Sequence, residues 1–249
     1  MLSISADKID SLFESIASSY NLYIPVDNES GKAEFEQWEK GKKLSSALKT
    51  VRSAKDFFFP KVENLVNYKR EGKSITVVDP RKDLGDFVIF GVRGCDAASF
   101  AIIDDVYLKM DPVDSYYKNR RNHGTVVTLA CTEPAQTCFC STYNIDATNP
   151  KGDVTSWCAD GKYFFQANTD KGNALIEKIK SLLSESDDKA VEAQKKEVSE
   201  KIEKSEGVIN YFVKSIEKII SNYVAYYASS APSSSSITSG SGVISSIFA

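Results

Sequence analysis

The sequence has no long hydrophobic run and no export signal. None of its apolar stretches approaches the roughly 18 residues that a membrane-spanning helix needs, so we expect no membrane span. Residues 1–8 lack the basic segment and apolar core of a secretory signal. Five cysteines, an odd number, in a chain without an export signal indicate reduced thiols rather than a disulfide framework. We therefore expect a soluble, cytoplasmic protein.

Several common site motifs are also missing. There is no P-loop, no Gly-x-Gly-x-x-Gly fingerprint and no serine-nucleophile elbow, so a stand-alone flavin or nucleotide enzyme ranks low. No Cys-x-x-Cys occurs, which argues against a zinc ribbon or a thioredoxin-like site. The single histidine, His123, fits a surface or capping position better than a metal ligand. A net charge of −3, with both signs interspersed, argues against a general nucleic-acid binder.

The middle of the chain has the pattern of an α/β protein. The apolar, β-branched runs 87–92 and 125–130 are typical of buried strands, and a helix is expected between them at 96–108. This order implies a right-handed crossover and a parallel pair. Three aromatic residues before Pro60 indicate a buried edge segment over 52–60. Further strands are expected at 20–26, 75–78 and 163–167, and helices at 7–20 and 172–183. The predicted fold class is α/β, with a mainly parallel sheet flanked by helices.

Four of the five cysteines directly follow the two central strands. Cys95 comes after the first strand, and Cys131, Cys138 and Cys140 come after the second. In an open α/β sheet, ligands gather at the C-terminal ends of the strands, and converging thiolates are the ligands of iron–sulfur clusters. We therefore expect these four side chains to hold one cluster, of the [4Fe–4S] type. Cys158 lies near no other cysteine and is interpreted as a small buried hydrophobe.

Spacing alone leaves cluster binding and free buried thiols equally open. No standard ferredoxin spacing is present, and buried free cysteines are common. Because an extended backbone points alternate side chains to opposite faces, residues 138–140 must turn, and Pro134 suits such a turn. Asp96 could cap the following helix, and Arg93 could offset the charge of a thiolate-ligated cluster. A salt bridge from Arg93 to Asp96 or Asp104 is an equally good interpretation.

The C-terminal part of the chain changes character twice. Residues 189–228 carry apolar side chains at helical spacing, with Gly207 as the one candidate break. We interpret this apolar stripe as core or subunit interface. Residues 229–242 are almost entirely Ser, Gly, Ala and Pro, which is typical of a flexible tail. The predicted division is an α/β iron–sulfur-type domain at 1–185, a helical appendage at 186–228 and a Ser/Gly-rich tail at 229–249.

A series of motifs follows in order between residues 55 and 140. They are Lys-Asp-Phe-Phe-Phe-Pro at 55–60 with Glu63, Phe-Gly-Val-Arg-Gly-Cys-Asp at 90–96, Asp-Asp-Val-Tyr-Leu at 104–108, Asp-Ser-Tyr-Tyr at 114–117 with Arg120 and Arg121, and Cys131 with Cys-Phe-Cys at 138–140. Together they resemble the beta subunit of soluble sulfhydrogenases and the corresponding electron-transfer subunit of anaerobic sulfite reductases. Weaker similarity extends from residue 8 to about residue 185.

The resemblance implies an accessory electron-transfer subunit of a multi-subunit oxidoreductase. Its partners would be a reductase subunit that bears a flavin and a catalytic hydrogenase or sulfite-reducing subunit, and its cofactor an iron–sulfur cluster. Members of this family carry ferredoxin-like Cys-x-x-Cys-x-x-Cys-x-x-x-Cys-Pro runs after a long helix. Here the serine-rich residues 229–242 occupy that place, and serine hydroxyls are poor substitutes for thiolates. The alternative function is therefore a structural or assembly subunit without redox chemistry.

Overall fold

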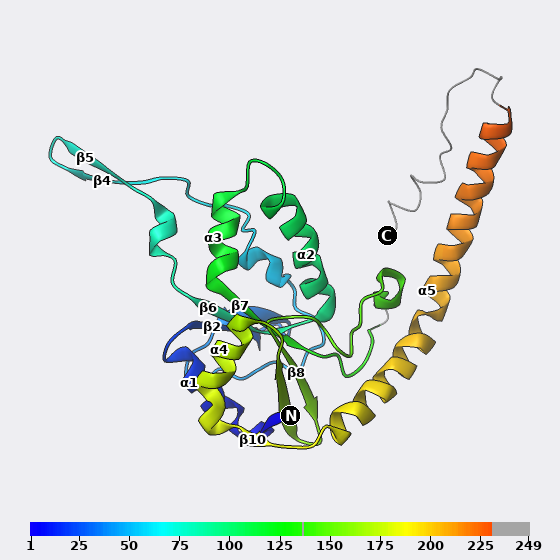
Figure 1. The fold of residues 1–249 in the computed structure, drawn as a ribbon, viewed down its shortest axis with the longest axis horizontal. Helices are drawn as coiled ribbons and strands as arrows, with labels where there is room; N and C mark the ends of the chain where they lie inside the picture. The colour runs from blue at the N-terminus through cyan, green and yellow to red at the C-terminus, as the bar shows by residue number, and fades with distance from the viewer. Residues whose placement is uncertain (136, 231–249) are drawn as a thin grey trace.

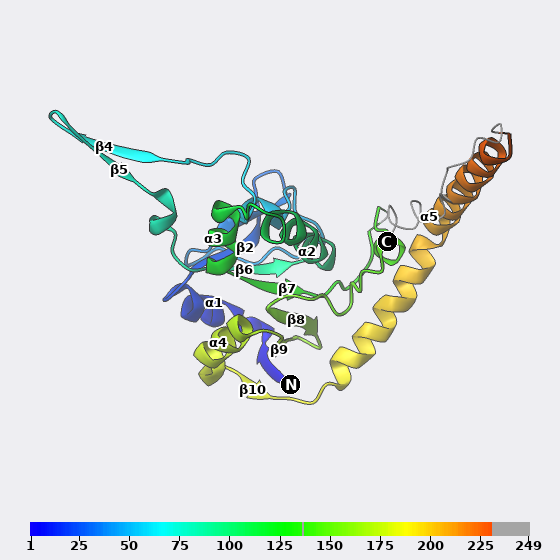
Figure 2. The ribbon, with the colours of Figure 1, turned by 45° about the horizontal axis from the view of Figure 1, so that its top comes forward.

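The structure is a computed structural model that describes residues 1–135 and 137–230, and it is built around an eight-stranded sheet (Figures 1 and 2). The strand order is β10-β1-β9-β8-β7-β6-β2-β3. The central strands β2 (Asn21–Asp27), β6 (Phe87–Val92), β7 (Gly124–Leu129) and β8 (Val154–Ala159) run parallel. The outer strands pair antiparallel: β3 (Ala33–Gln37), β9 (Lys162–Ala167), β1 (Leu2–Ser5) and β10 (Ser184–Glu185). The predicted α/β class is confirmed.

Helices cover both faces of the central strands. On one face, α1 (Ile9–Ala17) and α4 (Asp170–Ile179) pack over a core that includes Val88 and Phe90. On the other face, α2 (Gly94–Leu108) and α3 (Ser115–His123) pack over Phe87 and Ile89. Because both faces are covered, every residue of β6 and β7 is buried. This explains why these strands have continuous apolar sequence rather than an alternating pattern.

The segment at 52–60 is not the edge strand that the sequence suggested. Residues Ala54–Phe57 form a 3₁₀ helix, η2, and Ser53 caps it by accepting a hydrogen bond from the Lys55 N–H. Phe58 is fully buried, with its ring 5.1 Å from that of Phe100. Phe59 is exposed. The aromatic run therefore folds as a compact turn, because its members pack against α2 and β6 rather than along a sheet edge.

Two further elements differ from the prediction. Residues 75–78 are a strand, β5 (Ser74–Val78), but it pairs with β4 (Asn67–Glu71) in a separate two-stranded sheet. This hairpin projects away from the body of the molecule (Figure 1). The residues before β7, to which the sequence pattern assigned no element, form the helix α3. Asp114 caps α3 by accepting hydrogen bonds from the N–H groups of Tyr116 and Tyr117. Short 3₁₀ helices complete the described part: Ala6–Lys8 (η1), Pro80–Asp83 (η3), Cys140–Tyr143 (η4) and Lys180–Leu182 (η5).

The C-terminal helix α5 (Lys189–Ser230) continues through Gly207, the candidate break, as one helix. Its first part packs on the domain and buries Val191, Val198 and Ile202. Its last part extends away from the sheet (Figure 1), and apolar side chains there are exposed to solvent. Within the described residues, no helix has the length and hydropathy of a membrane-spanning segment. Residues 231–249, which make up most of the predicted tail, lie outside the described part of the chain.

Candidate functional site

The predicted cysteine ligands follow two strands that end side by side. β6 and β7 are parallel neighbours, so both chains leave the sheet at the same edge. After β6 the chain enters α2 directly, and Cys95 is the second residue of that helix. After β7, the Cys131 N–H donates a hydrogen bond to the Ala147 carbonyl at 2.9 Å. Cys95 is exposed, whereas Cys131, Cys138 and Cys140 are half-buried.

Three of these thiols influence one another electrostatically. Burial raises the pKa of the Cys131 thiol, the Arg93 guanidinium opposes this rise, and the Cys95 and Cys138 thiols add to it. Loss of hydration also raises the pKa of the Cys95 thiol, and the Asp96 carboxylate raises it further. Backbone N–H groups at the start of α2 partly offset both effects. In the described residues, no three His, Cys, Asp or Glu side chains have the spacing of a metal site.

The chain turns before Cys138 and again after Cys140. The Cys138 N–H donates to the Ala135 carbonyl at 2.9 Å, and the Ala135 N–H donates to the Cys138 sulfur at 3.3 Å. A second turn follows, in which the Ile145 N–H donates to the Cys140 carbonyl at 2.9 Å. The first turn therefore places an amide donor on the Cys138 sulfur, and such donors stabilise sulfur that carries negative charge.

Helix α5 covers part of the cysteine segment, a contribution that the sequence did not reveal. Cys131 and Cys140 both pack against a small apolar cluster formed by Ala147 with Val198 and Ile202 of α5. From the sequence, the helical spacing of Val198 and Ile202 predicted that they are buried, but not that the cysteine segment is the surface they pack on. The contact separates this side of the segment from solvent, which is a condition for a stable cluster site.

Arg93 lies between the strand ends and donates hydrogen bonds to backbone carbonyls. Its Nη1 donates to the carbonyls of Leu129 and Ala130, at 3.3 and 3.1 Å, and its Nη2 donates to that of Ala47 at 3.2 Å. The salt bridge from Arg93 to Asp96 or Asp104 is therefore wrong. The guanidinium is instead held close enough to Cys131 to lower the pKa of that thiol.

Asp96 does not cap α2, because the N-cap residue of that helix is Arg93. The Asp96 carboxylate instead accepts hydrogen bonds from the Ser53 hydroxyl at 2.7 Å and from the Ala54 N–H at 3.3 Å. The Lys55 ammonium lies 3.5 Å from the same carboxylate. Asp96 thus ties the first turn of α2, which carries Cys95, to η2. Its predicted role at a cofactor stays a prediction.

The remaining cysteine lies near the C-terminal end of β8, the parallel neighbour of β7, and the histidine lies at the other end of β7. Cys158 lies in β8 and is half-buried, and the Tyr163 hydroxyl hydrogen-bonds to its sulfur. His123 precedes the first residue of β7, at the opposite end of the strand from Cys131. Its Nδ1 lies 2.6 Å from the Asp86 carboxylate, in agreement with the predicted surface position.

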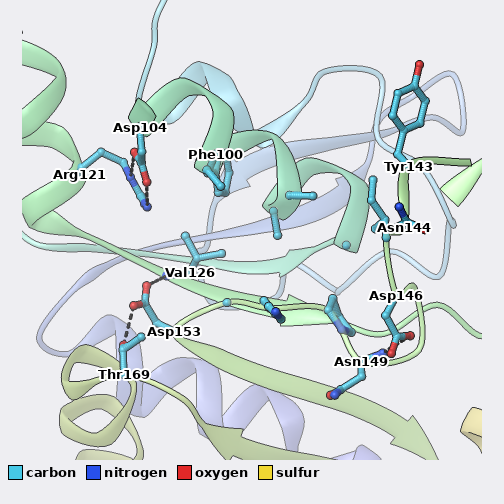
Figure 3. A pocket seen from close by; sticks show the side chains of 18 residues that line it. Phe100, Asp104, Arg121, Val126, Tyr143, Asn144, Asp146, Asn149, Asp153 and Thr169 are labelled. Atoms are coloured by element: carbon cyan, nitrogen blue, oxygen red, sulfur yellow. Dashed lines mark hydrogen bonds and ion pairs between the residues drawn. The ribbon is translucent and has the colours of Figure 1, made fainter. Parts of the chain in front are cut away.

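A cavity of about 600 Å³ lies between α2 and the loop that carries Tyr143, Asp146 and Asn149 (Figure 3). None of the described cysteines lines it. Asp104 accepts two hydrogen bonds from Arg121, each at 2.8 Å. Lower in the view, Asp153 accepts hydrogen bonds from the Val126 N–H and the Thr169 hydroxyl. These polar groups are paired within the protein.

Comparison with known proteins finds a partial sequence match. No family model matches the chain. Over 98 residues, which are 39% of this chain, the sequence is 35% identical to sulfhydrogenase 2 subunit beta of Pyrococcus furiosus. The match covers 27% of the length of that protein, so this chain corresponds to only a part of its relative. The similarity agrees with the resemblance that the ordered motifs show.

Proposed function

We propose that this chain is an accessory electron-transfer subunit of a multi-subunit oxidoreductase of the hydrogenase or sulfite-reductase kind. Cys95, Cys131, Cys138 and Cys140 would hold one iron–sulfur cluster, of the [4Fe–4S] type. The observation that carries the proposal is the placement of Cys95 and Cys131 directly after the ends of the neighbouring parallel strands β6 and β7. Similarity to a sulfhydrogenase beta subunit supports the assignment to such a complex.

The residues around the thiols fit a group of this chemistry. A cluster would supply one-electron transfer, and its thiolate ligands require compensation of negative charge. Arg93 provides a fixed positive charge beside Cys131. The Ala135 N–H provides a donor to the Cys138 sulfur. The first turn of α2 provides backbone N–H groups at Cys95. Asp96 would act as a positioning residue, because it fixes this turn against η2.

In the described structure the cysteine side chains do not form a metal site. The loop that carries Cys138 and Cys140 would therefore have to move toward Cys95 and Cys131 for all four sulfurs to bind one cluster. Cys138 lies in a turn closed by its own backbone and sulfur hydrogen bonds. Lys49 donates a hydrogen bond to the hydroxyl of the neighbouring Thr137. We infer that metal binding and the closure of this loop occur together, as is common for sites that are not preformed.

Helix α5 supports the proposed association with other subunits. Val198, buried over the cysteine segment, and Ile216, exposed, lie about five whole turns apart at 3.6 residues per turn. They therefore share one side of the helix. The same apolar side continues through Ile219, Ile220 and Tyr223, all of which are exposed. An apolar surface of this kind is typical of a protein–protein interface.

Anaerobic purification followed by iron and acid-labile sulfide analysis tests the proposal. The wild-type chain should contain iron and sulfide in equal amounts, and Cys131→Ser should lose most of both. Cys158→Ser is the matched control, because Cys158 is also a half-buried cysteine at the sheet, and it should retain both. A wild-type chain without iron or sulfide after anaerobic reconstitution would contradict the proposal.

The alternative is a structural or assembly subunit without redox chemistry. The raised pKa of the thiols of Cys95 and Cys131 favours it, because thiolates rather than thiols bind metal. Under this alternative, Cys131→Ser would leave the subunit composition and activity of the complex unchanged. Under the proposed function, the complex would assemble but electron transfer through it would fall.

A further inference from the structure

The β4–β5 hairpin, residues 67–78, stands away from the body of the molecule, and we refer to it as the arm (Figure 1). A two-stranded hairpin is at best marginally stable by itself in water. Among the described residues, no other strand pairs with either of its edges. Tyr68, Ile75 and Val77 are 72, 66 and 69% exposed. Large apolar side chains at this exposure on a projecting hairpin indicate that something covers them.

The register of the arm places its apolar side chains on one face. Tyr68 lies directly opposite Val77, and Arg70 lies directly opposite Ile75. Side chains two residues apart in a strand share a face, so these two pairs are on the same side. The other side carries the pairs of Asn67 with Val78, of Lys69 with Thr76 and of Glu71 with Ser74, and its only large apolar side chain, Val78, is at the base of the arm. The arm therefore has one apolar face, with Arg70 toward its tip, and one polar face.

The base of the arm is fixed to helix α3. On the incoming side, the Arg120 guanidinium lies 2.7 Å from the Glu63 carboxylate, and the Tyr116 hydroxyl donates a hydrogen bond to the Leu65 carbonyl. On the outgoing side, the Arg81 guanidinium stacks 4.8 Å from the Tyr116 ring, and Asn119 donates to the Arg81 carbonyl at 3.1 Å. The segments on both sides of the arm are therefore bound to α3, and the two strands of the arm project away from the body of the molecule.

The charge of the arm indicates the kind of surface that would cover it. It contains three basic residues, Lys69, Arg70 and Lys73, and one acidic residue, Glu71, whereas the whole chain has a net charge of −3. Two copies of the chain that met arm to arm would bring like charges together, so the better charge complement is an acidic groove. Complementary charges at the rim of an interface guide association and select the partner.

We propose that the apolar face of the arm docks into an apolar groove, bordered by carboxylates, on another subunit of the same complex. Tyr68, Val77 and Ile75 would enter the groove, and Arg70 would pair with a carboxylate at its edge. The inference rests on the proposed function only in placing the partner in an oxidoreductase complex. The arm and the end of α5 lie at opposite sides of the molecule (Figure 1), so the arm provides a contact separate from that of α5.

The test compares complexes purified from native cells that express the tagged full-length chain. Tyr68→Ser with Val77→Ser should lower, by about tenfold or more, the amount of one co-purifying subunit, because central apolar contacts are lost. Arg70→Glu should lower it as well, and added salt should weaken the wild-type contact. Ser74→Ala with Thr76→Ala, on the polar face, is the matched control and should retain every subunit. Because all these side chains are exposed, thermal unfolding of the isolated variants should be unchanged.

A photo-reactive benzoylphenylalanine in place of Tyr68 identifies the covered surface. The inference expects its cross-links in an apolar segment of that same subunit, with Asp or Glu nearby. Cross-links to a second copy of this chain, or full subunit content in the Tyr68→Ser, Val77→Ser complex, would overturn it. The iron content of each complex is measured in parallel. Wild-type complexes without iron would count against the proposed function. Loss of one subunit from arm variants whose complexes still contain iron would support the inference about the arm and would leave the proposed function unaffected.

Discussion

Arg93 connects three segments that the proposed site needs in fixed positions. It follows β6, donates to the end of β7 and reaches the Ala47 carbonyl in the loop after β3. Its charge acts on Cys131 through space. A guanidinium is suited to this position because its several N–H donors lie in one plane and it stays charged. The residue is therefore both a structural link and a fixed cation that acts on Cys131.

Arg93→Gln should affect both roles. Loss of the charged hydrogen bonds should reduce the free energy of unfolding by about 1.5–3 kcal/mol. Removal of the positive charge should make reduction of a bound cluster harder, so its potential should become more negative. Chemical denaturation and an EPR-monitored redox titration measure the two effects. Arg52→Gln, an exposed arginine, is the control. An unchanged potential with reduced stability would limit Arg93 to its structural role.

The ion pair of Asp104 with Arg121 should be important for stability. Both side chains are largely buried, the pair has two contacts of 2.8 Å, and the Tyr117 hydroxyl donates to Asp104 at 2.6 Å. Asp104→Asn leaves the Arg121 charge without its partner and should reduce the free energy of unfolding by about 3 kcal/mol. Asp105→Asn, which removes an exposed pair with Lys109, should cost less than about 0.5 kcal/mol. Urea denaturation of both variants checks this difference, and equal losses would contradict it.

At the scale of elements, the sequence predicts the centre of the sheet well and its surroundings less well. β6, α2 and β7 are recognised because burial on both faces requires continuous apolar runs. Helix α3 is missed because its sequence is mostly polar. It forms because Asp114 caps it and Arg121 binds Asp104 of α2, and the second of these is a tertiary contact. The cysteine positions follow from the strand ends, but their cover by α5 depends on contacts between residues that are distant in sequence.

The first part of α5 should support cluster loading. Val198→Ala removes buried methyl groups that pack with Cys131 and Cys140, and it should reduce the free energy of unfolding by about 2 kcal/mol. Greater access of water to the thiols should also reduce the iron content after reconstitution. Ile219→Ala, on the exposed part of the same helix, should change stability by less than about 0.5 kcal/mol and leave iron content unchanged. Equal iron contents in the two variants would show that α5 does not protect the site.

At the scale of the whole molecule, the features proposed for contact and chemistry are separated. The cysteine segment lies at one edge of the sheet, the arm projects from the α3 side, and the far half of α5 extends in another direction (Figures 1 and 2). A small protein with surfaces on different sides can contact two partners at once. This arrangement agrees with the proposed position between an electron donor and an electron acceptor in one complex.

The isolated chain should self-associate through the exposed side of α5. Ile216, Ile219 and Tyr223 are exposed in the structure, and surfaces of this kind are covered in stable proteins. Without its partners, the purified chain should therefore give a mass above that of one chain in light scattering. Ile216→Ser with Ile219→Ser should shift it to the monomer, whereas Lys218→Gln, on the polar side of the helix, should not. A wild-type monomer at high concentration would remove the case for an interface on this helix.

The position of β1 has a consequence for how the chain folds during synthesis. This strand is made before the other strands of the sheet, yet it pairs with β9 and β10, which lie more than halfway along the sequence. The parallel centre of the sheet can form earlier, since β2, β6 and β7 are made before β9. Until β9 has emerged, β1 has no strand to pair with, and the edge of β8 stays open. Completion of the sheet is therefore a late step, at the stage when the chain is most exposed to mispairing.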